Sequence, residues 1–270
     1  MDDLGPADWP PGLPPLAHTV PLSGGFVCRV LAGTLTDGRA VVVKRCPYPA
    51  DVEADGLMAI AAAGAPVPAV LGAQGDVLVL ERVGGDGTSP DWAALGRAVA
   101  RVHRMTGPRY GWHRDNASGR IVQHNGWCDD WPAFFVERRV RVHLPDRAVP
   151  EPLRLRLERA CAGPLPALLP VRPPASLTHG DLWAGNVVDG RWLLDPAVAY
   201  ADRELDLAYM DGSAGLPAEF HAAYRAEWPP DPGYARRRPA LQLHTLLVHL
   251  RHFGERYVPR IEAVLDGYGW

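Results

Sequence analysis

The chain has 270 residues, of which 47% are hydrophobic, and its formal net charge is −3. This length suits one large domain or two lobes, and the weakly acidic charge argues against nucleic acid or an anionic membrane as a partner, because both require a basic surface. No apolar run approaches the roughly 20 residues that cross a bilayer. The first residues lack a basic flank followed by an apolar run, so we expect no signal peptide and a cytoplasmic protein.

The cysteines and the lysine are each informative. The four cysteines form no C-x-x-C pair (Cys28, Cys46, Cys128 and Cys161). We therefore expect reduced thiols and no structural zinc. The oligomeric state stays open: a monomer is favoured, and the scattered cysteines also permit a disulfide-linked dimer. Lys44 is the only lysine among 28 lysine and arginine residues. This suggests a compact point charge that the planar guanidinium of arginine does not replace.

The first part of the chain predicts strands. Residues 1–17 are rich in proline and weakly patterned, which is typical of a lead-in segment. Residues 26–35 and 39–45 are β-rich and flank a turn with the letters T-D-G. This pattern predicts a β-hairpin with Lys44 at the end of its second strand.

The pattern then changes from strands to helices. Residues 51–63 predict a helix that ends at Gly64, and residues 68–72 and 76–83 predict two more strands. Beyond the glycine-rich segment 84–87 the apolar residues recur at helical spacing. A helix is expected there with Ser89 as its cap and Pro90 in its first turn, followed by an apolar face (Trp92, Leu95, Val99 and Val102).

This order of elements predicts an α+β fold with the bilobal layout of protein-kinase-like proteins. Residues 1–84 are expected to form a small β-rich lobe that binds ATP. Residues 85–270 are expected to form a larger, mainly helical lobe with the catalytic loop and the acceptor site. The boundary is placed at the glycine-rich segment, where the periodicity changes.

The stretch T-H-G-D-L-W-A-G-N at 178–186 carries the clearest chemistry. Asp181 and Asn186 lie five residues apart, and the dipeptide Asp189-Gly190 predicts a hairpin that returns Asp195 towards Asn186. Carboxylate and amide oxygens are ligands for Mg²⁺, with phosphate oxygens and water completing its shell. The sequence therefore predicts Asn186 and Asp195 as metal ligands and Asp181 as the base for a substrate hydroxyl, as in a kinase catalytic loop.

The remaining residues of this loop shape it. Gly180 and Gly185 permit tight backbone turns. Trp183 either forms a wall of the acceptor pocket, where a ring face suits a sugar, or packs under the loop. His179 is expected to organise the loop by hydrogen bonds to the backbone, and His103 to have a structural role on its helix.

A set of ATP contacts is expected in the first lobe. In kinase-like lobes a lysine at a strand end contacts the α- and β-phosphates and pairs with a glutamate on a helix. This predicts Lys44 with Glu53, and Asp55 is a second candidate acid. The turn before the first strand either covers the phosphates or is a plain turn, and the end of the last strand is where adenine should meet backbone groups (Ser23, Gly24, Gly25, Glu81 and Val83).

Other features have two readings or exclude a class. The acids Asp202, Glu204 and Asp206 lie near a predicted helix start. Either Asp202 or Asp206 orients the catalytic loop, or these acids interact favourably with the positive end of the helix dipole. The arginines at 236–238 are expected to be solvated. The motifs G-x-S-x-G, G-x-G-x-x-G and G-x-x-x-x-G-K-[ST] are absent from the sequence, which argues against a hydrolase triad, a Rossmann site and a P-loop.

Two blocks of the sequence resemble the fructosamine kinase, or ketosamine-3-kinase, family. The first is H-G-D-L-W-A-G-N at 179–186 with L-L-D-P-A-V-A-Y-A-D-R-E-L-D-L-A behind it. The second begins Y-G-W-H-R-D-N-A-S-G and ends D-W-P-A-F-F-V-E-R-R-V, between 110 and 140. The resemblance covers about residues 18–267. It implies the aminoglycoside-phosphotransferase-like branch of the protein-kinase-like fold.

The resemblance also implies an activity. Members phosphorylate the 3-hydroxyl of a ketosamine with ATP and Mg²⁺, and the product decomposes and frees the amine, which counts as repair of a glycation adduct. Carried onto this chain, it makes Asp181 the base, Asn186 and Asp195 the magnesium ligands and Lys44 the phosphate contact. Five residues of the second block are implied near the acceptor, or else tie loops together and fill a buried helix face (Asp115, Asn116, Gln123, Asn125 and Trp131).

The chain also departs from the family pattern and leaves rivals open. Phe26 stands where a small polar or acidic residue is expected, and Ala117-Ser118 departs from the more usual Asn-x-Ile-Gly pattern that begins at Asn116. A kinase for an aminoglycoside, choline or a simple sugar is one rival. A non-catalytic nucleotide-binding module is another, but it should lack the base, a metal ligand or the lysine. Ribulosamine, erythrulosamine and fructosamine acceptors remain equally compatible with the sequence.

Overall fold

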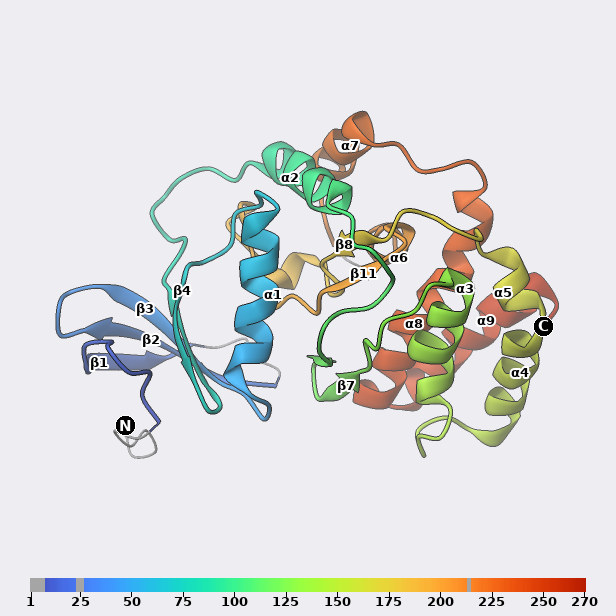
Figure 1. Ribbon diagram of the computed structural model, residues 1–270, viewed down its shortest axis with the longest axis horizontal. Helices are drawn as coiled ribbons and strands as arrows, with labels where there is room; N and C mark the ends of the chain where they lie inside the picture. The colour runs from blue at the N-terminus through green and yellow to red at the C-terminus, as the bar shows by residue number, and fades with distance from the viewer. Residues whose placement is uncertain (1–7, 23–26, 213–214) are drawn as a thin grey trace.

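A computed structural model describes residues 8–22, 27–212 and 215–270. A sheet near the N-terminus is followed by a mainly helical part in which the C-terminus lies (Figure 1). The α+β class and the bilobal layout expected from the sequence are therefore confirmed. Helix α1 and the strands β8 and β11 lie between the sheet and the C-terminal helices (Figure 1).

The N-terminal sheet has five antiparallel strands in the order β1-β2-β3-β5-β4. Their bounds are Leu16–Pro21 (β1), Arg29–Leu35 (β2), Ala40–Arg45 (β3), Val70–Gln74 (β4) and Val77–Glu81 (β5). The predicted hairpin and the two later strands are thus confirmed. In this register Val30 lies opposite Lys44, which places the lysine in the paired part of β3.

Both faces of the sheet are covered by apolar side chains. One face packs on α1 (Ala50–Ala62), where Leu57 is buried against Leu78 and Leu80. The other face packs on the lead-in segment through Trp9 and Leu13. Because both faces are covered, β5 is a continuous apolar run rather than an alternation of polar and apolar residues.

Strand β1 was not expected from the sequence. Its residues were assigned in part to an unpatterned lead-in, but they pair with β2, from Leu16 opposite Leu35 to Pro21 opposite Leu31. Its side chains are mostly exposed because it is an edge strand. An edge strand with little burial lacks the apolar alternation by which strands are recognised.

The helical part contains helices of very different lengths. Their bounds are Trp92–Arg104 (α2), Trp131–Phe135 (α3), Val136–Val140 (η1), Arg141–His143 (η2), Glu151–Ala162 (α4), Pro164–Leu168 (α5), Ala184–Asn186 (η3), Glu204–Met210 (α6), Ala218–Glu227 (α7), Tyr234–Phe253 (α8), Glu255–Tyr257 (η4) and Val258–Tyr268 (α9). Three two-stranded ribbons complete it, namely β6 (Asn116–Ser118) with β7 (Ile121–Gln123), β8 (Ser176–Thr178) with β11 (Ala199–Ala201), and β9 (Val187–Val188) with β10 (Trp192–Leu193).

Helix α2 (Trp92–Arg104) begins two positions later than its sequence suggested. Asp91, not Ser89, is the cap, since its side chain accepts a hydrogen bond of 2.8 Å from the amide of Ala94. Helix α2 packs closely on α7, and a Cβ at Gly96 would collide with the carbonyl oxygen of Phe220. The glycine therefore permits this close approach of the two backbones.

Two of the cysteines form a disulfide, which corrects the expectation that all four are reduced. Cys28 and Cys46 are bonded, with their Cα atoms 4.3 Å apart. The register of the hairpin explains the pairing, because Arg29 lies opposite Arg45 and the next positions outward are the two cysteines. Cys128 and Cys161 are free.

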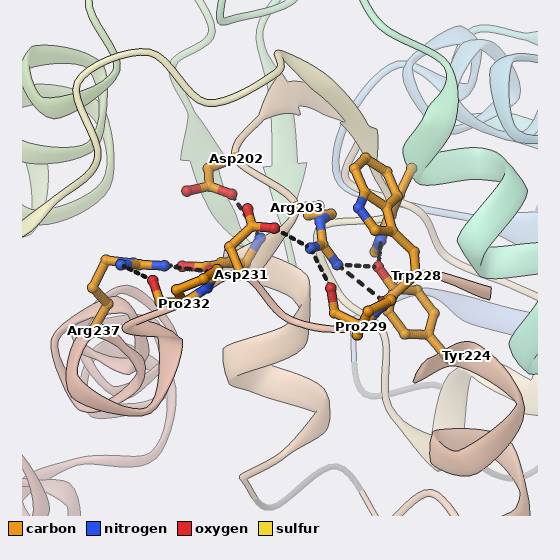
Figure 2. A network of polar contacts seen from close by, with 10 residues as sticks. Asp202, Arg203, Tyr224, Trp228, Pro229, Asp231, Pro232 and Arg237 are labelled. Carbon is orange, nitrogen blue, oxygen red and sulfur yellow. Dashed lines mark hydrogen bonds and ion pairs between the residues drawn. The ribbon is translucent and has the colours of Figure 1, made fainter. Parts of the chain in front are cut away.

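A buried ionic network fixes the start of α6 (Figure 2). The Arg203 guanidinium donates to the carbonyl oxygen of Pro229 at 2.8 Å and to Asp231 at 2.9 Å, and it lies 4.0 Å from the ring centroid of Trp228. Glu204 accepts two hydrogen bonds of 2.7 Å from Arg237. Arg237 is therefore half-buried and paired, contrary to the expectation of a solvated arginine run.

No helix in the described part of the chain is long and apolar enough to cross a membrane.

Candidate active site

The loop at 179–186 follows strand β8 and is shaped by its two glycines. Gly180 has φ +81°, and a Cβ there would collide with the carbonyl oxygen of Ala197. A Cβ at Gly185 would collide with the ring of Trp183. Larger residues at either position would displace the loop, which explains the glycines in the motif.

The backbone at the start of the loop is held by Asp206 from α6. Its carboxylate accepts hydrogen bonds from the amides of His179 at 2.6 Å and Gly180 at 3.0 Å. It also lies 3.1 Å from Nε2 of His103, whose Nδ1 contacts the Tyr224 hydroxyl at 2.7 Å. Asp206 therefore orients the loop, one of the two roles left open by the sequence.

Asp181 and Asn186 face each other within the loop. The Asn186 amide nitrogen donates to the Asp181 backbone oxygen at 2.9 Å and to its carboxylate at 3.0 Å. Burial raises the pKa of Asp181 to about 7, reinforced by the charges of Asp195 and Asp206 and opposed by the hydrogen bond from Asn186. A carboxyl group with this pKa can accept a proton near neutral pH.

The hairpin that follows brings Asp195 back to the loop, as its turn residues predict. Asp189 has φ +50° and Gly190 φ +61°, the two left-handed positions of a type I′ turn. The amide of Leu194 then donates to the Asn186 carbonyl oxygen at 2.9 Å. The same Asp189 accepts a 2.7 Å hydrogen bond from the amide of Gly85, so the glycine-rich connection is tied to the hairpin.

Lys44 lies between two carboxylates. Its Nζ donates to Glu53 at 2.6 Å and to Asp195 at a shorter distance. Burial opposes the charge of Lys44, but the two carboxylates more than compensate and raise its pKa. Of the two candidate acids on α1, Glu53 makes this contact, whereas Asp55 accepts a 2.6 Å hydrogen bond from the indole of Trp112.

The donor set at Asn186 and Asp195 fits a divalent cation. The Asn186 amide nitrogen is directed at Asp181, which leaves its oxygen side available. The Asp195 side chain is 48% exposed, and next to it the Lys44 ammonium holds its pKa low against the effect of burial. An ionised carboxylate and a free amide oxygen are hard ligands of the kind Mg²⁺ takes.

These groups line a cavity of about 800 Å³. Asp181, Asn186, Asp195, Lys44 and Glu53 lie on its wall. Trp183 also lines it and is 42% exposed while its ring covers Gly185. The tryptophan is thus accessible to a ligand and packs on the loop at the same time.

The expected acceptor residues of the second block are not on the cavity wall. Trp131 is 0% exposed and packs among Tyr110 and Phe134. Asn116 and Gln123 are buried, and their amide nitrogens donate to the carbonyl oxygens of Val198 and Ala197.

The other two residues of this block are also engaged within the protein. Asn125 accepts a 2.7 Å hydrogen bond from Arg139. Asp115 binds His124 and the amide of Asn125. These contacts favour the alternative structural role over contact with the acceptor. The cavity is instead lined nearby by the backbone-rich segment Ala117, Ser118 and Gly119.

The other residues expected at ATP are Ser23, Gly24, Gly25, Glu81 and Val83. Ser23, Gly24 and Gly25 lie outside the described residues, as does Phe26. Glu81 ends β5 and is exposed, and neither Glu81 nor Val83 lines the cavity.

Sequence reasoning missed Tyr209 and the last helices as parts of the site. Tyr209, on α6, lines the cavity, and its hydroxyl interacts with the Asp181 carboxyl group. His249, Phe253, Tyr257 and Arg260 line the cavity from α8, η4 and α9. Their only signal in the sequence is a run of aromatic and basic residues at helical spacing, which also fits a packed helix end.

The chain matches known proteins along most of its length. The family model described as fructosamine kinase matches residues 47–268. A probable ketoamine kinase of Enterococcus faecium is 32% identical over 92% of this chain and 94% of its own length. One of Lactiplantibacillus plantarum is 36% identical over 65% of this chain and 66% of its own length.

Solved structures agree with these relatives. The crystal structure of a "putative fructosamine-3-kinase" from Thermobifida fusca has a TM-score of 0.83 at 30% identity, covering 93% of each chain. A macrolide 2′-phosphotransferase at 18% identity, with a TM-score of 0.57, shows the same protein-kinase-like fold. The chain belongs to the fructosamine kinase family and is an ATP-dependent kinase that acts on a hydroxyl group.

Proposed function

We propose that the protein transfers the γ-phosphoryl group of ATP to the 3-hydroxyl of a ketosamine, such as a ribulosamine or a fructosamine, in the removal of glycation adducts. One observation carries the proposal. Asp181, Asn186, Asp195 and Lys44 converge on one cavity in a chain of this family. The tryptophan that lines the cavity beside them offers a ring face to a sugar.

Each residue has a task in this proposal. Asp181 accepts the proton of the attacking hydroxyl, and its raised pKa suits that exchange near neutral pH. Lys44, kept charged by Glu53 and Asp195, neutralises phosphate charge. Asp206 holds the backbone of the loop, so that Asp181 is positioned before the acceptor binds.

Asn186 and Asp195 would hold a Mg²⁺ ion that arrives with ATP. When bound, the cation neutralises charge on the phosphate oxygens. Asn186 has a second task that needs no metal, because its amide nitrogen fixes the orientation of the Asp181 carboxylate.

The same proposal assigns a role to each of the two lobes. Residues 1–84 bind ATP, with Lys44 as the phosphate contact and Glu53 as its partner on α1. Residues 85–270 supply the catalytic loop and the acceptor site. We further propose that the protein acts as a cytoplasmic monomer.

A coupled ADP-release assay with MgATP tests the function. The acceptors are ribulose-lysine, erythrulose-lysine and fructose-lysine, with an aminoglycoside, choline and free ribulose as comparisons. We expect turnover on at least one ketosamine, and none with Asp181→Asn. Turnover on a comparison acceptor alone would retain the kinase and refute the ketosamine assignment.

A thermal-shift titration with ATP, with and without Mg²⁺, separates a kinase from a non-catalytic module. We expect a larger rise in melting temperature when Mg²⁺ is present, because binding to the folded state stabilises it. The same response in Asp181→Asn would show that the variant still binds the nucleotide.

A further inference from the structure

The cavity has a second wall that the proposed chemistry does not use. This wall comes from the end of α8, from η4 and from the first turn of α9, and it carries His249, His252, Phe253, Tyr257 and Arg260. These residues lie between 68 and 79 positions after Asp181 in the sequence, yet they line the same cavity as that carboxylate.

Aromatic rings connect the catalytic base to the far end of this wall. The Tyr209 hydroxyl interacts with Asp181, and its ring centroid lies 6.1 Å from that of His249. The His249 ring is 5.1 Å from the ring of Tyr257. The guanidinium carbon of Arg260 lies 5.4 Å from the Tyr257 centroid. The wall therefore passes from a carboxylate, across flat ring surfaces, to a cation.

The cation at the end of this row has no carboxylate partner among the described residues. Arg260 is exposed and lines the cavity, and its guanidinium lies over the face of Tyr257. Burial, and then the nearby His252, Arg260 and Arg256, lower the pKa of His249 to about 4, so this ring adds no positive charge near neutral pH. An anionic group on a ligand would meet an unpaired guanidinium there rather than displace an existing ion pair.

We propose that Arg260 binds a carboxylate on the amine part of the acceptor, so that the enzyme prefers ketosamines of amino acids over those of uncharged amines. This inference rests on the proposed ketosamine kinase function. The sugar would lie near Asp181 and Trp183, while the carbon chain of the amine lies along the rings of His249 and Tyr257. Arg260 presents a planar fork of donors that matches a carboxylate.

Two matched pairs of acceptors test the preference. The short pair is the ribulose adducts of β-alanine and β-alaninamide. The long pair is the ribulose adducts of Nα-acetyl-lysine and its amide. Within each pair only the carboxylate is replaced, so any difference in kcat/KM reports on its recognition. We expect the carboxylate to be preferred by about 5–20-fold in at least one pair, as for a charged hydrogen bond near solvent.

Two arginine variants locate the source of the preference. Arg260→Gln should reduce the ratio of carboxylate to carboxamide turnover to within about 2-fold, mainly by raising KM for the carboxylate acceptor. Arg256→Gln is the matched control. It removes the same charge beside the same Tyr257 ring, but Arg256 does not line the cavity. The preference should survive in this control.

The outcomes separate the inference from the function on which it rests. Equal turnover of carboxylate and carboxamide in both pairs would refute carboxylate recognition while leaving the ketosamine kinase intact. An equal loss of preference in both arginine variants would refute direct contact by Arg260. No turnover on any ketosamine, while another acceptor is phosphorylated, would overturn the proposed function and this inference with it.

Discussion

The loop and hairpin at 178–195 and the polar block at 115–125 can be compared directly. Both carry carboxylates and amides within a few residues of each other. In the first, Asp181, Asn186 and Asp195 face a cavity and keep oxygen atoms available for a ligand. In the second, Asn116 and Gln123 are buried and donate to backbone carbonyls. Polar residues indicate a binding site only where the fold leaves their hydrogen-bonding capacity open.

The largest effect that this comparison predicts is at the base. Asp181→Asn should lower kcat by about 10³-fold or more, because an amide does not accept the proton, while the affinity for ATP changes little. Steady-state kinetics with a ketosamine and thermal shift with MgATP measure the two quantities. A variant that retains full turnover would remove Asp181 from the chemistry.

The lysine should show the next largest effect. Lys44→Arg is expected to lower kcat/KM for ATP by about 10²-fold, because the planar guanidinium does not fit between Glu53 and Asp195 as the ammonium does. Arg45→Lys, at the neighbouring surface position, is the control and should change it less than about 2-fold. Equal effects of the two variants would mean that the single lysine has no special role.

The polar block should behave in the opposite way. Gln123→Leu leaves the Asn116 side-chain oxygen and the Ala197 carbonyl without their donor, so it should lower the free energy of unfolding by about 1–3 kcal/mol. The KM for the acceptor should change less than about 2-fold. Denaturant unfolding and kinetics on one preparation check both, with Val122→Ala, at an exposed neighbour, as control. A large rise in KM at full stability would restore this block to the acceptor site.

The smallest effect concerns a buried acid of the network in Figure 2. Burial, together with the charge of Glu204, raises the pKa of Asp202 to about 7. The folded protein therefore holds this proton more tightly than the unfolded chain, and stability is lost as the pH rises from about 4 to 7. Asp202→Asn does not titrate, so its stability relative to the wild type should increase steadily as the pH rises from about 4 to 8. A constant difference across this range would contradict the shift.

Local signals explain what the sequence predicted about the fold. The alternation around T-D-G predicted the hairpin, and Asp189-Gly190 predicted the turn that returns Asp195 to the loop. Strand β1 was missed because an exposed edge strand shows no apolar alternation. The disulfide was missed because it depends on a cross-strand register that spacing alone does not reveal.

The site was predictable to the extent that its residues are close in sequence. The D-x-x-x-x-N spacing and the lysine on the hairpin led to residues that the fold does bring together. The pairing of Lys44 with Glu53 rather than Asp55 depends on which side of α1 faces the strand. Tyr209, Tyr257 and Arg260 reach the cavity through tertiary packing, for which the sequence carries no local signal.

The central claim is that the cavity-facing set, with Asp181 as base, phosphorylates a sugar hydroxyl of a ketosamine. Phosphorus NMR of a reaction with MgATP and ribulose-lysine tests it most directly. The account predicts a new phosphomonoester resonance coupled to the proton on carbon 3 of the sugar, and none with Asp181→Asn. A resonance that appears unchanged in the variant would contradict it. A resonance coupled to a proton on a carbon other than carbon 3 would contradict the proposed position of transfer.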